Sequence, residues 1–323
     1  MAVYTVLDSG AFARIAGAFG LGEVQTVDAI PEGSINTNHR VLTSSGRFFV
    51  RHTTVRSAEV LRFEAALLAH LAESHFPGPT PVLTVQGEPF LELQGGRVTV
   101  FRWLAGEELQ RSQLTPVHLE RLGHELGKMH RLTQSFGGSR DNPYSAAQVQ
   151  VWLKGLRSNS DAEVASVAVE LEGYLARAEQ ERGGGLEPQG VIHADLFMDN
   201  VKWLADRVGA FFDFEMACRD AYALDVAITL NAWCFDGDYL PELCQAFFRG
   251  YQDARPLSAV EREHLFGHAL FGAVRYTASR IRDFHLSPLP AEQLTRKSFR
   301  TYLARARTLV SLGPAGFLAR MGL

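Results

Sequence analysis

The chain has 323 residues, of which 46% are hydrophobic and 21% are charged. That length exceeds the size at which one hydrophobic core keeps growing, so we expect two lobes or domains. The net charge of -4 indicates no general attraction to nucleic acid or to an anionic membrane, and no apolar run approaches the roughly 20 residues that span a bilayer.

The cysteines and the first residues of the chain indicate its cellular compartment. Cys218, Cys234 and Cys244 are odd in number and lack a CxxC spacing, so the sequence predicts neither a disulfide framework nor a zinc site. No basic stretch followed by a continuous apolar one opens the sequence, so we expect no signal peptide. Together these features predict a cytoplasmic protein.

The N-terminal part is typical of a small β-rich lobe. Residues 24–54 read as three strand-like runs separated by the turn PEGS and by Gly46. A helix is predicted over 57–74, because apolar residues recur there at three- and four-residue steps and Ser57 can cap the first turn. Short strands separated by glycine and proline continue to about Trp103.

The rest of the chain is predicted to be mostly helical. Thr115 and Pro116 form an N-cap and first-turn pair, and an apolar stripe follows them. Further helices are expected at 145–157, 161–182, 221–235, 240–254, 258–283 and 293–311. The sequence therefore predicts an α+β fold with two lobes, 1–103 and 104–323, joined by a hinge near 103–106.

One polar hairpin interrupts the helices of the second lobe. The stretch VIHADLFMDNVKW places His193, Asp195 and Asn200 next to strand-like residues, and AFFDF adds Asp213 after the next apolar run. A hairpin brings Asn200 and Asp213 together, and their oxygens are ligands that suit Mg²⁺. Asp195 can accept the proton of a hydroxyl that attacks a phosphate. This is the pattern of phosphoryl transfer in the protein-kinase-like fold.

Other polar residues near the hairpin are expected to support it. His193 is predicted to brace the loop through hydrogen bonds to backbone. Asp199 is predicted to be a turn residue or a solvated neighbour and not a ligand. Asp225 lies in an apolar helical stretch, where a buried carboxylate needs partners. We expect it to accept backbone N–H groups of the catalytic loop.

The first lobe offers a nucleotide site. The turn PEGSINTN supplies Gly33, Ser34 and Asn36, whose backbone can approach phosphate closely. Where a kinase carries a phosphate-contacting lysine, this chain has Arg51, with Glu64 on the following helix as its partner; a surface ion pair is the alternative interpretation. At the hinge, the backbone of Arg102 and Trp103 is predicted to read the adenine edge.

With these motifs in hand, the sequence resembles the aminoglycoside phosphotransferase and choline kinase superfamily of small-molecule kinases. Within it, the chain is most similar to the type II bacterial homoserine kinases, through EGSINTN, GVIHADLFMDNV and FFDFEMACRDAYALDVAITLNAWCF. The turn departs from that family at Ile35, and the strand after it at Arg51 and His52. The resemblance implies ATP and Mg²⁺ as cofactors and phosphoryl transfer to L-homoserine, a step toward threonine.

An amino-acid acceptor needs a cation for its carboxylate. The candidates in the sequence are Arg219, Arg275, Arg280 and Arg282, each of which is also consistent with a solvated helix charge. No nucleic acid or membrane partner is expected, and the oligomeric state is left open.

Four other functions compete with this prediction. The first alternative is another small-molecule kinase, acting on choline, ethanolamine, an aminoglycoside or a sugar. Residues 258–323 contain ten Lys and Arg against four Asp and Glu, which disfavours a polycationic substrate such as an aminoglycoside. A protein kinase is disfavoured because FEMACRD replaces D-F-G and no A-P-E segment follows. A nucleotide-binding scaffold without turnover conflicts with the retention of the three catalytic polar residues. Nucleic-acid binding has only the basic helices behind it.

Overall fold

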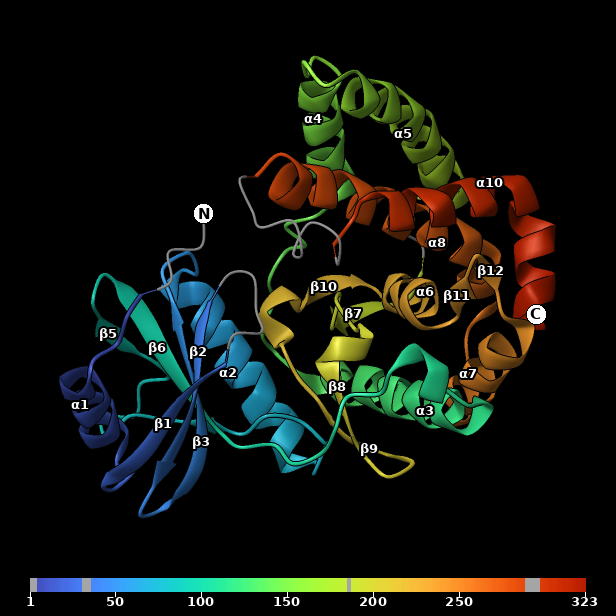
Figure 1. Ribbon diagram of the computed structural model, residues 1–323. Coiled ribbons are helices and arrows are strands. Elements are labelled where there is room, and N and C mark those ends of the chain that lie inside the picture. Colours follow the sequence, from blue (N-terminus) through green and yellow to red (C-terminus); the bar gives the residue numbers. More distant parts are fainter. Residues whose placement is uncertain (1–4, 31–35, 185–186, 288–296) are drawn as a thin grey trace.

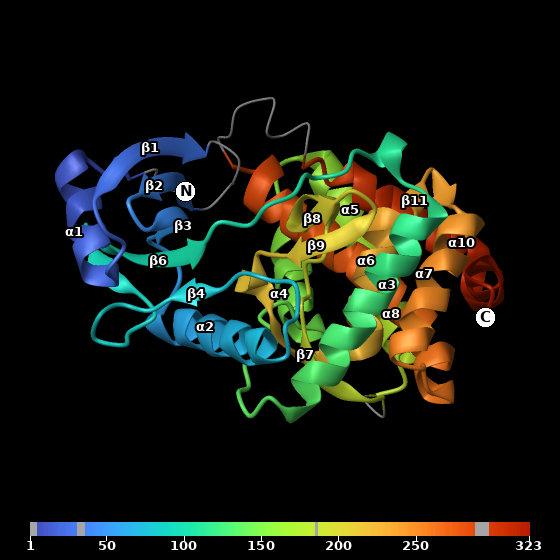
Figure 2. The same cartoon turned by 90° about the horizontal axis from the view of Figure 1, so that it is seen from below.

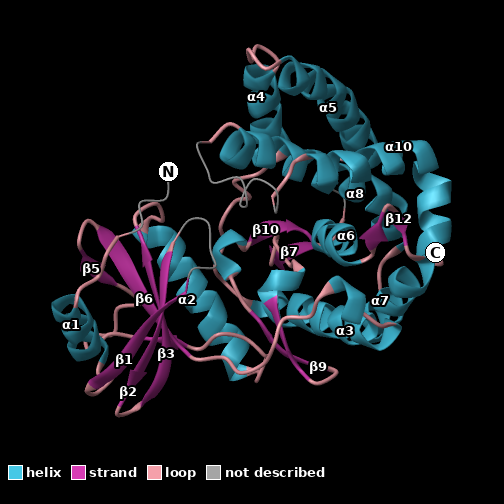
Figure 3. Cartoon of the chain, viewed as in Figure 1, coloured by secondary structure: helices cyan, strands magenta, loops and turns pink. Residues whose placement is uncertain are grey.

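The computed structural model describes residues 5–30, 36–184, 187–287 and 297–323. Strands gather at one end of the molecule and helices at the other, as the blue and the green-to-red parts of Figure 1 and the colours of Figure 3 show. The predicted α+β fold with a β-rich N-terminal lobe and a mostly helical C-terminal lobe is confirmed. No helix among the described residues is both long and apolar enough to cross a membrane.

The N-terminal lobe is built on one six-stranded antiparallel sheet with the order β1-β2-β3-β6-β4, and β5 pairs with β6. Its strands are β1 (Val24–Ile30), β2 (Thr37–Thr43), β3 (Gly46–Thr53), β4 (Pro81–Val82), β5 (Leu91–Leu93) and β6 (Gly96–Arg102). Two helices accompany the sheet, α1 (Ser9–Phe19) and α2 (Ala58–Glu73).

The alternation of side chains along β3 and β6 separates two environments. Phe48 and Val50 join the small core beneath α1, at the outer end of the molecule in Figure 2. Their neighbours Phe49 and Phe101 pack against the large core that α2 shares with the C-terminal lobe. Because successive side chains point to opposite faces of a sheet, Arg51 lies on this second face, toward the other lobe.

The described part of the C-terminal lobe contains seven α-helices, and the predicted hairpin lies against one of them, α3. They are α3 (Pro116–Leu132), α4 (Ala146–Leu156), α5 (Ala162–Glu181), α6 (Tyr222–Trp233), α7 (Pro241–Ala254), α8 (Ala259–Arg280) and α10 (Arg300–Met321). Three two-stranded sheets join them: β7 (Gln189–Ile192) with β10 (Cys218–Ala221), β8 (Val201–Leu204) with β9 (Arg207–Phe211), and β11 (Phe235–Asp236) with β12 (Asp238–Tyr239).

Glycines allow α3 and α7 to approach at backbone distance. A Cβ on Gly250 would lie 1.7 Å from the carbonyl oxygen of Glu120, and one on Gly123 would lie 2.1 Å from that of Phe247. Both are far below van der Waals contact, so these positions exclude any larger residue unless the helices separate.

A buried carboxylate joins the segment just before β7 to α8. Glu187 Oε1 accepts hydrogen bonds from His264 Nδ1, 2.9 Å away, and from His268 Nε2, 3.0 Å away. Burial opposes the ionisation of Glu187, but the bonds from the two histidines lower its pKa to about 2. The group therefore stabilises the fold as a carboxylate.

Two helices differ from the prediction. The helix expected at 293–311 begins at Arg300, and residues 288–296 lie outside the described part. Gly313, with a φ of 64°, breaks this helix, and a second helical run from Pro314 extends it to Met321. Helix α1 was not predicted, although Asp8 caps it through Ala11 and Gly20 ends it in the left-handed conformation. The predicted caps Ser57 and Thr115 are confirmed.

Candidate active site

The hairpin β8–β9 brings the predicted catalytic residues together. Asn200 closes a short 3-10 turn just before β8, and Asp213 follows β9. Val201 pairs with Phe211, and the N–H of Phe212 donates to the carbonyl oxygen of Asn200 over 3.0 Å. Asp213 then takes a φ of 63°, which turns the chain back at this position.

Asp195 is held from two sides. Its Oδ1 accepts a hydrogen bond of 2.7 Å from the hydroxyl of Tyr276 on α8. The Nδ2 of Asn200 donates to the carbonyl oxygen of Asp195 over 2.8 Å and to its Oδ2 over 3.4 Å. Burial raises the pKa of Asp195, while the Tyr276 bond and the charge of Arg275 oppose the rise. These contacts fix the orientation of the Asp195 carboxylate.

Asp225 on α6 anchors the backbone in front of Asp195. Its two oxygens accept from the N–H groups of His193 and Ala194 over 2.7 and 2.8 Å, and from His130 Nε2 over 3.0 Å. Ala194 has a φ of 63°, a conformation that alanine rarely adopts. The bonds to Asp225 hold that strained residue in place, and His193 Nε2 donates to Phe212 O over 3.0 Å.

The pair Asn200 and Asp213 suits a divalent cation. The Nδ2 of Asn200 faces Asp195, and no described residue donates to its Oδ1, so that oxygen is available as a ligand. The pKa of Asp213 is raised, first by loss of water between the lobes and then by the charges of Glu215 and Asp195. Asp213 is exposed to solvent, so the repulsion by its charged neighbours is the main cause of this rise. An ion with two positive charges would relieve this repulsion.

Arg51 occupies an ion cluster between the lobes, which we define as Arg51, Arg56, Glu64 and Glu215. Arg51 Nη2 lies 2.5 Å from Glu64 Oε2, and its Nη1 lies 3.0 Å from Glu215 Oε1. Arg56 Nη2 lies 2.9 Å from Glu215 Oε2. Burial opposes the charge of Arg51, but both carboxylates raise its pKa.

The interlobe ion cluster differs from the surface pair that the sequence left open. Arg51 is 5% exposed and Glu64 is 3% exposed, so the pair is buried. Glu215 follows the proposed metal ligand Asp213 by two residues and comes from the other lobe. No lysine occurs in residues 1–103, so any side-chain cation that this lobe offers to phosphate is an arginine or a histidine.

The turn and the hinge are placed only in part. Gly33 and Ser34 lie outside the described residues. Asn36 donates from Nδ2 to Glu215 Oε1 over 2.5 Å, which ties the turn to the interlobe ion cluster. At the predicted hinge, the N–H groups of Arg102 and Trp103 donate to Thr80 O and Arg47 O within the N-terminal lobe. An adenine contact at these two residues stays a prediction and would use their carbonyl groups.

The four arginines proposed for the substrate differ in their surroundings. Arg275 is 1% exposed, and its Nη1 donates to Ala194 O over 3.1 Å, so the interpretation as a solvated charge is wrong for it. Arg282 forms two bonds to Asp283 and lies 3.8 Å from the centre of the Trp152 ring. Arg219 is exposed on β10. Arg280 lines the pocket described next.

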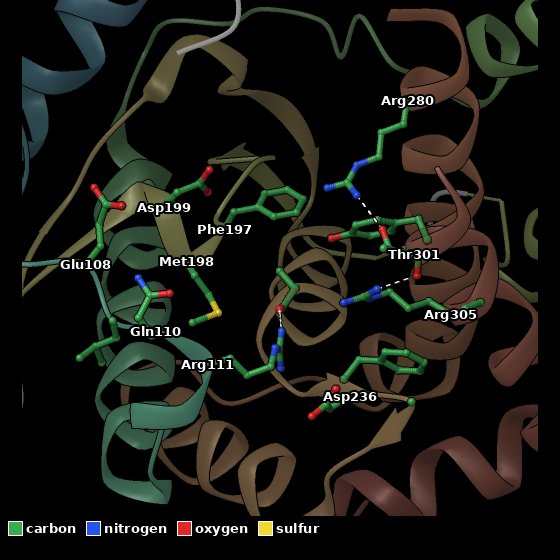
Figure 4. A pocket seen from close by; sticks show the side chains of 16 residues that line it. Glu108, Gln110, Arg111, Phe197, Met198, Asp199, Asp236, Arg280, Thr301 and Arg305 are labelled. Atoms are coloured by element: carbon green, nitrogen blue, oxygen red, sulfur yellow. Dashed lines mark hydrogen bonds between the residues drawn. The ribbon is translucent and has the colours of Figure 1, made fainter. Parts of the chain in front are cut away.

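A pocket of about 620 Å³ opens between the catalytic loop, the end of α6 and α10. Phe197, Met198 and Asp199 form one wall, and three arginines, Arg111, Arg280 and Arg305, project from other elements, as Figure 4 shows. Phe197 packs edge-on against Tyr276, the hydrogen-bond partner of Asp195, with ring centres 5.0 Å apart. Phe197 and Tyr276 therefore connect the pocket to the Asp195 carboxylate.

Several site residues were not predicted. Glu215 stands directly in the quoted FFDFEMAC motif, and an acidic residue two positions after a metal-binding aspartate was a usable signal. Tyr276, Arg111 and Arg305 carried no local signal, because each reaches the site from an element distant in sequence.

Comparison with protein-family models identifies the class. Residues 26–257 match the phosphotransferase enzyme family, which is more than half of the chain. The chain belongs to this family. It is a phosphotransferase of the small-molecule kinase type, with the two-lobed protein-kinase-like fold.

Curated relatives narrow the resemblance. The chain is 35% identical to a homoserine kinase of Brucella anthropi over 88% of this chain and 87% of the relative. It is 33% identical to the homoserine kinases of Rhizobium meliloti, over 95% of this chain and 94% of the relative, and of Parvibaculum lavamentivorans, over 98% and 99%.

Solved structures share the fold at lower identity. An amicoumacin kinase in complex with AMP-PNP, Ca²⁺ and Ami is 17% identical, with a TM-score of 0.75 over 96% of this chain and 95% of the other. Choline kinase from Cryptosporidium parvum is 15% identical, with a TM-score of 0.67 over 98% of this chain and 100% of the other.

Proposed function

We propose that the protein transfers the γ-phosphate of ATP to the hydroxyl of L-homoserine and forms O-phospho-L-homoserine. The observation that carries the proposal is the near full-length similarity to curated homoserine kinases. The juxtaposition of Asp195, Asn200 and Asp213 beside the β8–β9 hairpin supports the reaction class.

Asp195 acts as the base in this proposal. The bonds from Tyr276 and Asn200 orient its carboxylate, and the anchor on Asp225 fixes the backbone that carries it. The acceptor hydroxyl gives its proton to Asp195 as its oxygen bonds to the γ-phosphorus and the bond from that phosphorus to the bridging oxygen of ADP breaks. Positioning of this kind supplies much of the rate in phosphoryl transfer.

Mg²⁺ is the proposed metal, with Asn200 Oδ1 and the Asp213 carboxylate as its protein ligands. When bound, it neutralises charge on the phosphates. The ion cluster formed by Arg51, Arg56, Glu64 and Glu215 holds the loop after Asp213 against the N-terminal lobe. Arg51 remains our proposed phosphate contact, with Glu64 as its orienting partner.

An ADP-release assay with L-homoserine, L-serine, choline and an aminoglycoside tests the acceptor. We expect kcat/KM for L-homoserine to exceed the other values by at least about 100-fold, because a site built for an amino acid leaves its charged groups unpaired with the wrong acceptor. Phosphorus NMR should identify a phosphomonoester of homoserine. Preferential turnover of choline or an aminoglycoside would replace homoserine with that acceptor.

A further inference from the structure

The pocket beside the catalytic loop contains arginines without carboxylate partners. Arg111, Arg280 and Arg305 form no ion pair with any carboxylate in the described part of the chain, whereas Arg300 and Arg307 on the same α10 are paired with Glu163 and Glu170. Three carboxylates, Glu108, Asp199 and Asp236, line the same cavity. Charges of both signs in one cavity suit a ligand that itself carries both.

Two of the three arginines have a structural task. Arg111 donates to the carbonyl oxygens of Ala232 and Trp233, and Arg305 donates to that of Asn231 over 2.6 Å. These are the last carbonyls of α6, which need donors because the helix ends there. Arg111 and Arg305 therefore cap a helix.

Arg280 differs from its two neighbours. Only its Nη1 is engaged, by Ser298 O over 3.1 Å and by Thr301 Oγ1 over 2.7 Å. Among the described residues, none accepts from its Nε or Nη2, and those two N–H groups form the planar fork that matches a carboxylate. The guanidinium carbon of Arg280 lies over the Tyr302 ring, 4.5 Å from its centre, and this contact holds the guanidinium in place.

Arg280 is connected to Asp195 through two tyrosines. It follows Tyr276 by four residues on α8, so both side chains lie on the same face of the helix. Tyr302 bridges them, since its ring is 5.0 Å from that of Tyr276 and beneath the Arg280 guanidinium. Tyr276 in turn bonds to Asp195.

A carboxylate stands opposite this cation. Asp199 lies on the catalytic loop four residues after Asp195, is exposed to the pocket, and forms no hydrogen bond or ion pair with a described residue. Figure 4 shows the Phe197 ring between the Asp199 carboxylate and the Arg280 guanidinium. The two charges are opposite in sign and unpaired with each other.

We propose that this pocket binds the amino-acid end of the acceptor, with Arg280 holding the α-carboxylate and Asp199 the α-ammonium group. This inference rests on the proposed function, since it takes the acceptor to be an amino acid. With both charged ends held away from Asp195, the side-chain hydroxyl is the group left to reach it. The pocket would then select zwitterions over cations such as choline.

Substrate analogues that lack one charge separate the two contacts. We would measure KM for L-homoserine, for 3-aminopropan-1-ol, which has no carboxylate, and for 2,4-dihydroxybutyrate, which has no ammonium group; an analogue that is not turned over is measured as an inhibitor. Arg280→Gln should weaken L-homoserine and 2,4-dihydroxybutyrate by roughly ten- to a hundredfold and leave 3-aminopropan-1-ol unchanged. Asp199→Asn should show the reverse selectivity.

Controls make the result specific. Arg307→Gln, on the neighbouring helix and outside the pocket, should leave all three values unchanged, and Arg280→Lys should recover part of the loss. The proposal is overturned if Arg280→Gln weakens all three ligands equally, or if Arg111→Gln and Asp236→Asn show the selective pattern instead.

Calorimetric titration of L-homoserine into the protein with ADP separates this inference from the proposed function. If L-homoserine binds the wild type, loses affinity in Arg280→Gln, and yet is not phosphorylated, the pocket assignment stands and the proposed reaction is wrong. If L-homoserine is phosphorylated with an unchanged KM in Arg280→Gln, the reaction stands and the pocket assignment is wrong.

Discussion

Replacing Arg51 with alanine removes the cation that joins two buried carboxylates from different lobes. The change leaves Glu64 without its bidentate partner, while Glu215 keeps Arg56 and Asn36. The effect on Glu64 should dominate, because a charge without a partner inside a protein loses hydration and gains nothing in return.

The structure sets the magnitude. The Arg51 and Glu64 side chains are 6% and 4% exposed, and removal of one partner from a buried ion pair typically costs about 3–5 kcal/mol. We expect the free energy of unfolding to fall by that amount. We also expect kcat/KM for ATP to fall roughly ten- to a hundredfold, because the loop after Asp213 loses a tether and the phosphates lose a contact.

Urea unfolding and steady-state kinetics with varied ATP measure the two effects. Arg51→Lys should recover part of both, since the charge returns but the fork geometry does not. Arg62→Ala is the matched control, because Arg62 forms an exposed pair with Glu88 at 3.3 Å and should cost less than about 1 kcal/mol. If Arg51→Ala behaved like Arg62→Ala in both assays, the assigned role of the interlobe ion cluster would be refuted.

The remaining predictions concern the metal, the helix packing and pH. Asp213→Ala should be nearly inactive at any Mg²⁺ concentration and Asn200→Ala partly rescued by high Mg²⁺ or Mn²⁺, and metal titrations identical to wild type would contradict the metal assignment. Gly250→Ala should lower the free energy of unfolding in urea by about 1–3 kcal/mol or more, because its Cβ would lie 1.7 Å from a carbonyl oxygen. Gly155→Ala is the control: no atom lies within 4 Å of its Cβ, so it should be neutral or stabilising. Equal effects of the two substitutions would refute the packing argument. Glu187→Gln should cost about 1–3 kcal/mol at pH 7. Because the pKa of Glu187 is lowered from 4.5 to about 2, its stabilisation is complete above pH 4.5 and is lost as the pH falls toward 2, so the gap to wild type should close over that range; a constant gap would contradict it.

Features with local physical causes were predictable from the sequence. The helix over 57–74 and the one after Thr115 follow from side-chain capping and apolar spacing, and the structure places them within a residue or two. The hairpin that carries Asn200 and Asp213 follows from two strand-like runs around a short turn.

Long-range partners were not predictable in the same way. Glu215 meets Arg51 across 164 positions, and Tyr276 meets Asp195 across 81, so no spacing rule applies to either pair. Helix α1 is a different case, because its cap at Asp8 and its stop at Gly20 were present in the sequence and were not used. The length of α10 depends on Gly313. This residue breaks the helix, but the chain resumes a helical conformation at Pro314.

The role of Asp195 as acceptor of the hydroxyl proton is tested most directly by Asp195→Asn with L-homoserine and ATP. An amide keeps the size of the side chain but cannot serve as the base, so the turnover number should fall by about 10²–10⁴ or more. The affinity for ATP, measured by calorimetry in the same preparation, should stay near the wild-type value because the nucleotide contacts lie elsewhere. Near wild-type turnover in Asp195→Asn would show that Asp195 is not the base.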